Sequence, residues 1–140
     1  YALSTPCSVS ECDAFVSHSW RDNAEEKWVA LKAWCEDFEA THKRPPRLWL
    51  DKVCIEQSNI ESDLQCLPIY LAGCDRLLIL SGPTYTERLW CCVELFVYML
   101  MLVEDPDRKL PTMITLGDND NEQAMVRECW ENFDVASSIL

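Results

Sequence analysis

The amino-acid sequence predicts an α/β protein of doubly wound design, in which two layers of helices enclose a central parallel sheet of four or five strands. Short β-type runs alternate along the chain with longer segments of helical period, which is the pattern of right-handed βαβ units. The run 77–80 is entirely aliphatic, as expected of a parallel strand that is buried on both faces. Residues 1–140, of which 49% are hydrophobic, can bury one core and form a single domain.

Five strands and four helices follow from this pattern. The expected strands are residues 13–17, 47–50, 76–80, 111–116 and 135–140. The expected helices are residues 23–40, 64–71, 84–103 and 121–133, and a polar loop over 51–62 precedes the second helix. This order is typical of a flavodoxin-like, three-layer αβα domain.

Breaks in the first half of the chain separate the elements. The first helix has an apolar face, formed by Trp28, Leu31, Cys35 and Phe38. Pro45 and Pro46 then interrupt the chain before the second strand. The second helix ends near Gly73, as helices often end at glycine.

The third helix has the clearest start signal. Gly82-Pro83 indicates a turn, and the spacing of Thr84 and Glu87 fits a capping box, in which each side chain bonds the other residue's amide. Asp105-Pro106 ends this helix. The fourth helix has an apolar side, formed by Ala124, Met125, Cys129 and Trp130.

Charge and cysteine content exclude several classes of partner. A net charge of −12 argues against nucleic acid and against an anionic membrane surface. The longest apolar run, 95–103, is far shorter than the ~20 residues of a spanning helix, so we expect no membrane contact. Nine cysteines, an odd number, without a signal peptide indicate a reducing, cytoplasmic environment. Without a C-x-x-C pair, and with two histidines, we expect no metal site.

Several cofactor motifs are missing from the sequence. The three glycines are too far apart for a Rossmann fingerprint or a P-loop. Ser81 stands where a phosphoacceptor receiver has aspartate. The acidic run 118–122 starts like a calcium loop but has no glycine at its sixth position and Cys129 at its twelfth. No Gly-x-Ser-x-Gly elbow is present.

The expected carboxyl ends of the strands define the default ligand site of such a sheet. These ends are the polar segments 17–21, 51–53, 81–82 and 117–118. We therefore expect ligands to bind along this edge.

Glu94 does not fit the helix that contains it. It is the only charged residue between Leu89 and Val103, and a helix that is apolar all round is a buried helix. A buried carboxylate is costly unless it is paired, protonated or open to a cleft. A structural glutamate would pair with a buried arginine or reach the surface, whereas one that does neither is a functional candidate.

Three segments together resemble a TIR domain, of the Toll/interleukin-1 receptor and plant resistance-protein type. Residues 13–17 look like the opening strand of that family, and 50–60 resemble its second strand and long BB loop. Residues 77–85 followed by Trp90-Cys91-Cys92-Val93-Glu94-Leu95 are similar to the plant signature, a strand ending in Ser, a Tyr, then Trp-Cys-x-x-Glu-Leu. The resemblance covers roughly residues 13–103 and points to a divergent, plant-like or TIR-like branch.

The resemblance implies an activity and a set of site residues. Many TIR domains cleave NAD at the nicotinamide–ribose bond, and the family's catalytic glutamate falls on Glu94. The resemblance implies NAD as substrate and no separate cofactor. The implied substrate-binding residues are Ser17, His18, Trp20, Arg21, Lys52, Ser81 and Trp90. Among these, Trp20 would stack on a ring, Arg21 would meet the pyrophosphate and Lys52 would lie at the rim.

The sequence also departs from the family pattern. Trp20-Arg21-Asp22 stands where plant-type domains often carry Arg-Gly-Glu-Asp, and the loop 51–62 lacks the usual glycine or proline. The chain starts at Tyr1 without methionine and ends on an apolar stretch. We therefore expect a domain excised from a larger protein that lacks part of its C-terminal end.

Three functions remain open at this stage. The first is an NAD+ glycohydrolase that yields ADP-ribose, or a cyclic or variant nucleotide signal, and that is activated by self-association. The second is a non-catalytic module in innate-immunity signalling that binds other TIR domains. The third is a hydrolase of another N-glycosidic bond in a nucleotide. Glu94 favours the enzymes, since an interaction module has no need of a carboxylate there.

Overall fold

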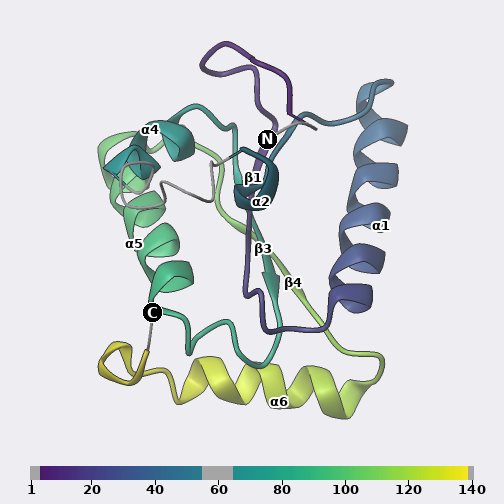
Figure 1. Cartoon of the computed structure of the whole chain (residues 1–140), viewed down its shortest axis with the longest axis vertical. Coiled ribbons are helices and arrows are strands. Elements are labelled where there is room, and N and C mark those ends of the chain that lie inside the picture. The colour runs from purple at the N-terminus through teal and green to yellow at the C-terminus, as the bar shows by residue number, and fades with distance from the viewer. Residues whose placement is uncertain (1–3, 55–64, 139–140) are drawn as a thin grey trace.

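The computed structural model describes residues 4–54 and 65–138 (Figure 1). Its centre is a four-stranded, all-parallel sheet in the order β2-β1-β3-β4. The strands are β1 (Ala14–His18), β2 (Leu48–Trp49), β3 (Leu77–Ser81) and β4 (Thr112–Thr115). Phe15 lies opposite Leu77 in the central pair. This topology confirms the predicted α/β fold with a parallel, flavodoxin-like sheet.

Helices cover both faces of the sheet (Figure 1). The long helix α1 (Ala24–His42) packs on one face. Two helices, α4 (Leu67–Ala72) and α5 (Leu89–Glu104), pack on the other. The other helical elements of the described residues are the single turn α2 (Asp51–Cys54), α6 (Asp120–Glu131) and the 3-10 turn η1 (Val135–Ser137).

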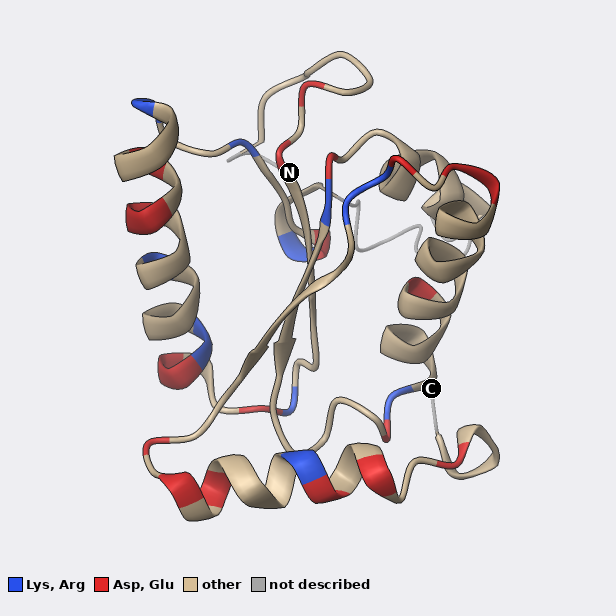
Figure 2. Cartoon of the chain, turned by 180° about the vertical axis from the view of Figure 1, so that it is seen from behind, with Lys and Arg blue, Asp and Glu red and all other residues tan. Residues whose placement is uncertain are grey.

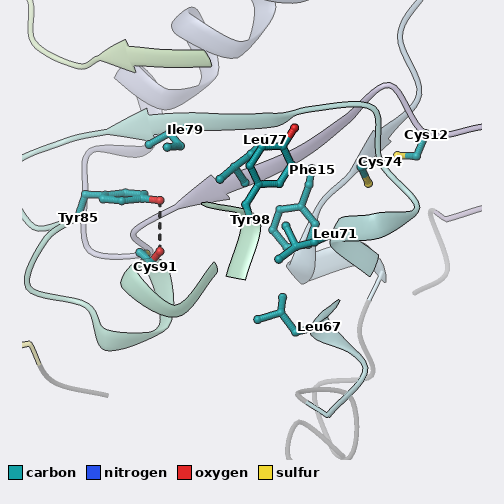
Figure 3. Packing of buried hydrophobic residues seen from close by; sticks show 10 residues of the cluster. All are labelled: Cys12, Phe15, Leu67, Leu71, Cys74, Leu77, Ile79, Tyr85, Cys91 and Tyr98. Atoms are coloured by element: carbon teal, nitrogen blue, oxygen red, sulfur yellow. Dashed lines mark hydrogen bonds between the residues drawn. The ribbon is translucent and has the colours of Figure 1, made fainter. Parts of the chain in front are cut away.

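Strand alternation divides the core in two. Side chains at successive strand positions point to opposite faces, so Ala14, Val16 and Leu78 pack beneath α1. Phe15 and Leu77 point the other way, into the larger cluster beneath α4 and α5, which Figure 3 shows from close by. The same alternation places Ser17 and Ser81 on the α5 face, and this decides which side chains Glu94 meets.

Helix α6 crosses the carboxyl ends of the strands rather than lying along a face (Figure 1). At its C-terminal end, Trp130 donates a hydrogen bond from Nε1 to the Ser81 hydroxyl at 2.8 Å. The Trp130 ring also lies 5.6 Å, centroid to centroid, from that of Tyr85. This helix therefore closes the edge at which ligands of such sheets bind.

The capping box predicted at Thr84 and Glu87 is wrong. Helix α5 begins at Leu89, and its N-cap residue, Arg88, makes no side-chain capping bond. Thr84 instead bonds Asp22 Oδ1 through both its amide (2.9 Å) and its hydroxyl (2.8 Å). Because Thr84 forms its hydrogen bonds with Asp22, 62 positions earlier, the segment 83–87 forms turns rather than helix.

The predicted apolar faces of two helices are confirmed only in part. Leu31 and Phe38 of α1 and Trp130 of α6 pack inwards as predicted. Trp28 is 61% exposed, while Trp34 packs towards the sheet and contacts Phe38, their ring centroids 5.4 Å apart. On α6, Met125 is 60% exposed and Val126 is buried in its place. Ala124 is exposed as well. Tertiary packing rather than the local pattern decides which side of a mixed helix is buried.

The fifth strand predicted over 135–140 is absent from the described residues. Residues Val135–Ser137 form η1, since the Asp134 side chain accepts a hydrogen bond from the Ala136 amide at 3.0 Å. The polar loop predicted over 51–62 begins with α2, and its remainder lies outside the described residues. The other predicted elements are confirmed to within a few residues at their ends.

In the described parts of the chain, none of the helices combines the length and the apolar character needed to cross a membrane.

Candidate functional site

Glu94 lies in the second turn of α5 and is 3% exposed. Figure 2 shows that acidic colour is sparse along this helix, in contrast to α1 and α6. Among the described residues, no lysine, arginine or histidine forms a salt bridge with it. Neither structural explanation for this glutamate therefore applies: it is not paired with a buried arginine, and it does not reach the surface.

One hydroxyl group bonds the Glu94 carboxyl group directly, and a second hydroxyl group bonds the first. The Ser17 hydroxyl donates a hydrogen bond to Glu94 Oε2 at 2.5 Å. Because that donation uses the only hydrogen of Ser17, the Tyr85 hydroxyl, 2.7 Å away, donates to Ser17 Oγ. The result is a chain of donors from Tyr85 through Ser17 that ends on the carboxylate.

The local fold explains how these groups meet. Ser17 follows Phe15 on the same face of β1 and so points towards α5. Tyr85 belongs to the turn between β3 and α5 and is fully buried, with its hydroxyl also 3.5 Å from the Cys91 carbonyl oxygen (Figure 3). Trp90 lies four residues before Glu94 and therefore on the same side of α5.

Burial raises the pKa of the Glu94 carboxyl group to about 8. Loss of hydration is the main cause, and the negative charge of Asp51 adds to it. Hydrogen bonds from Ser17 and from the Trp90 side chain oppose the rise by stabilising the charged form. Glu94 is therefore mostly protonated at neutral pH in this state, and ionises slightly above it.

A second group of candidates gathers around Asp51, just after β2. The Trp20 indole donates a hydrogen bond from Nε1 to Asp51 Oδ2 at 2.7 Å. Lys52 Nζ lies 6.0 Å from the centroid of the same ring. Trp20 is 54% exposed, so its ring offers a fixed, flat and accessible surface.

His18 points away from Glu94. Strand alternation turns its side chain to the α1 face, while its carbonyl oxygen accepts a hydrogen bond from Cys91 Sγ at 3.4 Å. Burial lowers the pKa of the His18 imidazole and outweighs the opposing effect of Asp51. The imidazole is therefore neutral at physiological pH.

Arg21 and Ser81 form no hydrogen bond or ion pair with the Glu94 carboxyl group in the described parts of the chain. Arg21 is exposed and lines a separate pocket between α1 and α6. The Ser81 hydroxyl is fully buried and accepts the hydrogen bond from Trp130. The structure thus brings Ser17 and Trp90 to Glu94, groups Trp20 with Lys52, and gives His18, Arg21 and Ser81 other surroundings.

Sequence reasoning assigned no role to Tyr85 or Asp51. Both were visible: Tyr85 belongs to the family-like segment after the third strand, and Asp51 stands at the carboxyl end of the second. Their hydrogen-bond partners could not be identified from the sequence, because Ser17 lies 68 positions from Tyr85 and Trp20 lies 31 positions from Asp51. A hydroxyl-bearing residue between a buried strand and an apolar helix was the available signal for Tyr85.

No three carboxylate, thiol or imidazole groups are placed to hold a metal ion in the regions the structure describes.

No family model, curated protein or solved structure matches this chain. A carboxyl group that is buried, bonded only by neutral donors and able to ionise near pH 8 can stabilise a positive charge that develops beside it.

We expect Ser17→Ala to raise the pKa of Glu94 further, by about one unit, because the carboxylate loses a donated hydrogen bond. The 13C resonance of the Glu94 carboxyl group, followed through a pH titration, measures this shift. Ser19→Ala is the matched control, since the Ser19 hydroxyl bonds Thr84 instead. An unchanged or lower Glu94 pKa in Ser17→Ala would contradict the assigned bond.

Proposed function

We propose that this chain is a TIR domain that hydrolyses the nicotinamide–ribose bond of NAD+, with Glu94 as the catalytic residue. The observation that carries the proposal is the burial of Glu94 without an ion-pair partner among the described residues, held by Ser17 at 2.5 Å. Burying such a group costs stability, and carboxyl groups with raised pKa values concentrate at functional sites.

The reaction needs one carboxylate rather than two. When the C1′–N bond breaks, its electron pair passes to the ring nitrogen, so nicotinamide leaves as a neutral ring and needs no acid. The ribose acquires oxocarbenium character, as in glycoside hydrolysis. Ionised Glu94 stabilises that charge. Water then adds to C1′ and releases a proton, which gives ADP-ribose, whereas attack by a group of the same nucleotide gives a cyclic product.

The exposed groups around Asp51 fit the binding of the rest of the dinucleotide. The Trp20 ring, fixed by its bond to Asp51, supplies a stacking surface for a planar ring. Lys52 and Arg21 are exposed cations on the same edge and suit the pyrophosphate. The His18 imidazole faces away from Glu94 and is neutral, so it adds no charge to the site.

Nicotinamide release from NAD+ by the purified domain tests the proposal. We expect release per molecule to rise with protein concentration, because activity in this family is tied to self-association. A panel of nucleosides and nucleotides run in parallel separates an NAD+ glycohydrolase from a hydrolase of another N-glycosidic bond. No release from any substrate, by folded protein at high concentration and under crowding, would rule out the enzyme.

The rate of nicotinamide release from NAD+ should increase with pH. Since the ionised carboxylate is the active form, kcat/KM for NAD+ rises about tenfold per pH unit below the Glu94 pKa of about 8 and levels off above it. The positively charged nicotinamide ring of bound NAD+ favours ionised Glu94. The apparent pKa in the kcat profile is therefore lower than that in the kcat/KM profile. Initial rates between pH 5.5 and 9.5 measure both curves. A rate that falls with rising pH would mean that protonated Glu94 is the active form.

A second candidate, an interaction module, is favoured by the outer surface of α5. Phe96, Leu100 and Val103 are exposed there and lie on one side at helical spacing. Such an apolar row suits association with another TIR domain. Sedimentation of Leu100→Glu and of wild type, together with their nicotinamide release, separates the two functions. If Leu100→Glu no longer associates but still releases nicotinamide at high protein concentration, this surface is not needed for catalysis.

A further inference from the structure

Cys12 and Cys74 form a pair of thiols at the amino-terminal edge of the sheet. The two residues lie opposite each other in a parallel β-bridge, Cys12 just before β1 and Cys74 just before β3. Both are free cysteines and both are buried. Figure 3 shows their side chains side by side at one end of the larger core cluster. Cys12 is at the opposite end of β1 from Ser17, so the pair does not belong to the site around Glu94.

The backbone holds the two cysteines at a separation that a disulfide can span. Neighbouring strands lie about 4.8 Å apart, which places the Cα atoms of bridged residues within the roughly 4.4–6.8 Å of a disulfide. The Asp75 amide donates to the Cys12 carbonyl oxygen at 2.9 Å, and the Ser10 amide donates to that of Gly73 at 3.1 Å. These bonds fix the register, so the two sulfur atoms can join without a rearrangement of the sheet.

The two thiols are already bonded to each other. The Cys12 thiol donates to the Arg47 carbonyl oxygen at 3.4 Å, and its sulfur accepts a hydrogen bond from the Cys74 thiol. This bond lowers the pKa of Cys12 and raises that of Cys74. The Arg108 guanidinium, which donates to the Cys74 carbonyl oxygen at 2.9 Å, acts against that rise. The pair therefore ionises first at Cys12, and a thiolate next to a thiol is the reactant from which disulfides form.

The chain that covers Cys12 is thin. Cys12 is 6% exposed, and residues 5–11 before it are exposed and form neither helix nor strand. Its contacts with the rest of the domain include the backbone bond from Ser10 and an exposed ion pair between Glu11 and Arg47 at 3.4 Å. Segments of this kind open locally without unfolding of the whole domain. Each opening exposes Cys12 to a small oxidant in solution.

We propose that Cys12 and Cys74 are a redox-active pair that a peroxide converts into a disulfide. The Cys12 thiolate attacks one oxygen of hydrogen peroxide, the O–O bond breaks, and the sulfur becomes a sulfenic acid while the other oxygen leaves as water. The Cys74 sulfur then attacks the Cys12 sulfur, the S–O bond breaks, and the hydroxide leaves as water with the thiol proton. The two thiols lose two electrons and the peroxide gains them. The proposal does not depend on NAD+ cleavage.

The bond would join β1 to β3 and close the loop 13–73. Closing a loop of this length restricts the unfolded chain, which stabilises the folded one. We expect oxidation to raise the Tm of the domain by about 5 °C, and a thiol reductant to return it to the original value.

Peroxide treatment of the folded domain, then alkylation of the remaining thiols and peptide mass spectrometry without reduction, tests the proposal. We expect one linked peptide pair that contains Cys12 and Cys74 and lacks two hydrogen atoms. In Cys74→Ala, Cys12 should remain a sulfenic acid that dimedone traps. The Tm of Cys12→Ala and of Cys74→Ala should not rise with peroxide. Cys35→Ala, which removes a partly buried thiol of α1, is the matched control and should form the disulfide at the wild-type rate.

Three results would overturn the proposal. The first is oxidation that stops at the exposed thiol of Cys7. The second is a disulfide that joins any other two cysteines. The third is alkylation of both Cys12 and Cys74 when the treated protein is unfolded. If an alanine variant does not fold, the linked peptides of the wild type still decide the pairing.

Discussion

Glu94→Gln is expected to lower nicotinamide release from NAD+ about a thousandfold at pH 8.5, where the wild-type carboxyl group is largely ionised. Glutamine has nearly the same shape, and its carbonyl oxygen can accept the hydrogen bond from Ser17. It carries no charge, so the developing ribose cation loses its main stabilisation while the packing of α5 is kept. Chromatographic measurement of nicotinamide under single-turnover conditions isolates the chemical step.

Glu104→Gln is the matched control for this substitution. Glu104 is exposed at the C-terminal end of the same helix, so its variant changes net charge equally without touching the site. We expect it to retain wild-type activity. Equal loss in both variants would indicate an effect of net charge, and full activity in Glu94→Gln would remove Glu94 from the mechanism.

Glu94→Gln is expected to stabilise the folded domain in alkaline solution, by about 4 kcal/mol at pH 8.5 relative to its effect at pH 5. The pKa of Glu94 rises from an ordinary 4.5 to about 8 on folding. Between these values the folded state holds a proton that the unfolded chain has lost, so the free energy of unfolding decreases with rising pH. Glutamine does not ionise, so the free energy of unfolding of Glu94→Gln does not decrease with pH for this reason.

Urea denaturation at pH 5 and pH 8.5 measures this difference for wild type and Glu94→Gln. The two proteins should be nearly equally stable at pH 5 and diverge towards pH 8.5. A constant difference would mean that Glu94 ionises as it does in the unfolded chain. A wild type that gains stability over Glu94→Gln at pH 8.5 would mean that folding lowers the Glu94 pKa. The expected result identifies Glu94 as a residue retained at a cost in stability.

Hydrophobic pattern was sufficient for the fold and for the central residue of the site. Strands such as Leu77–Ser81 are buried on both faces, and their composition alone makes them recognisable. Glu94 stands out because it is the only charged residue of an apolar helix. Both features are local, so a single sequence contains them.

Features set by distant partners could not be predicted in this way. Thr84 and Glu87 have capping-box spacing, but Asp22 takes the Thr84 hydroxyl and the helix starts five residues later. Trp28 and Trp34 are equally apolar, and only the sheet beneath α1 decides that Trp34 is the partly buried one. The donor chain from Tyr85 to Glu94 likewise depends on a strand 68 positions away.

The placement of α6 across the strand ends has a thermodynamic consequence. Trp130 ties the helix to Ser81 and to the ring of Tyr85, and Glu94 is 3% exposed in this arrangement. A ligand can therefore reach the carboxyl group only in molecules that have opened. Its apparent dissociation constant is the intrinsic one divided by the open fraction, so each 1.4 kcal/mol of opening free energy weakens binding about tenfold. Under the proposed function, the closed domain is inactive, and any contact that stabilises the open form increases the rate of nicotinamide release without changing a catalytic residue.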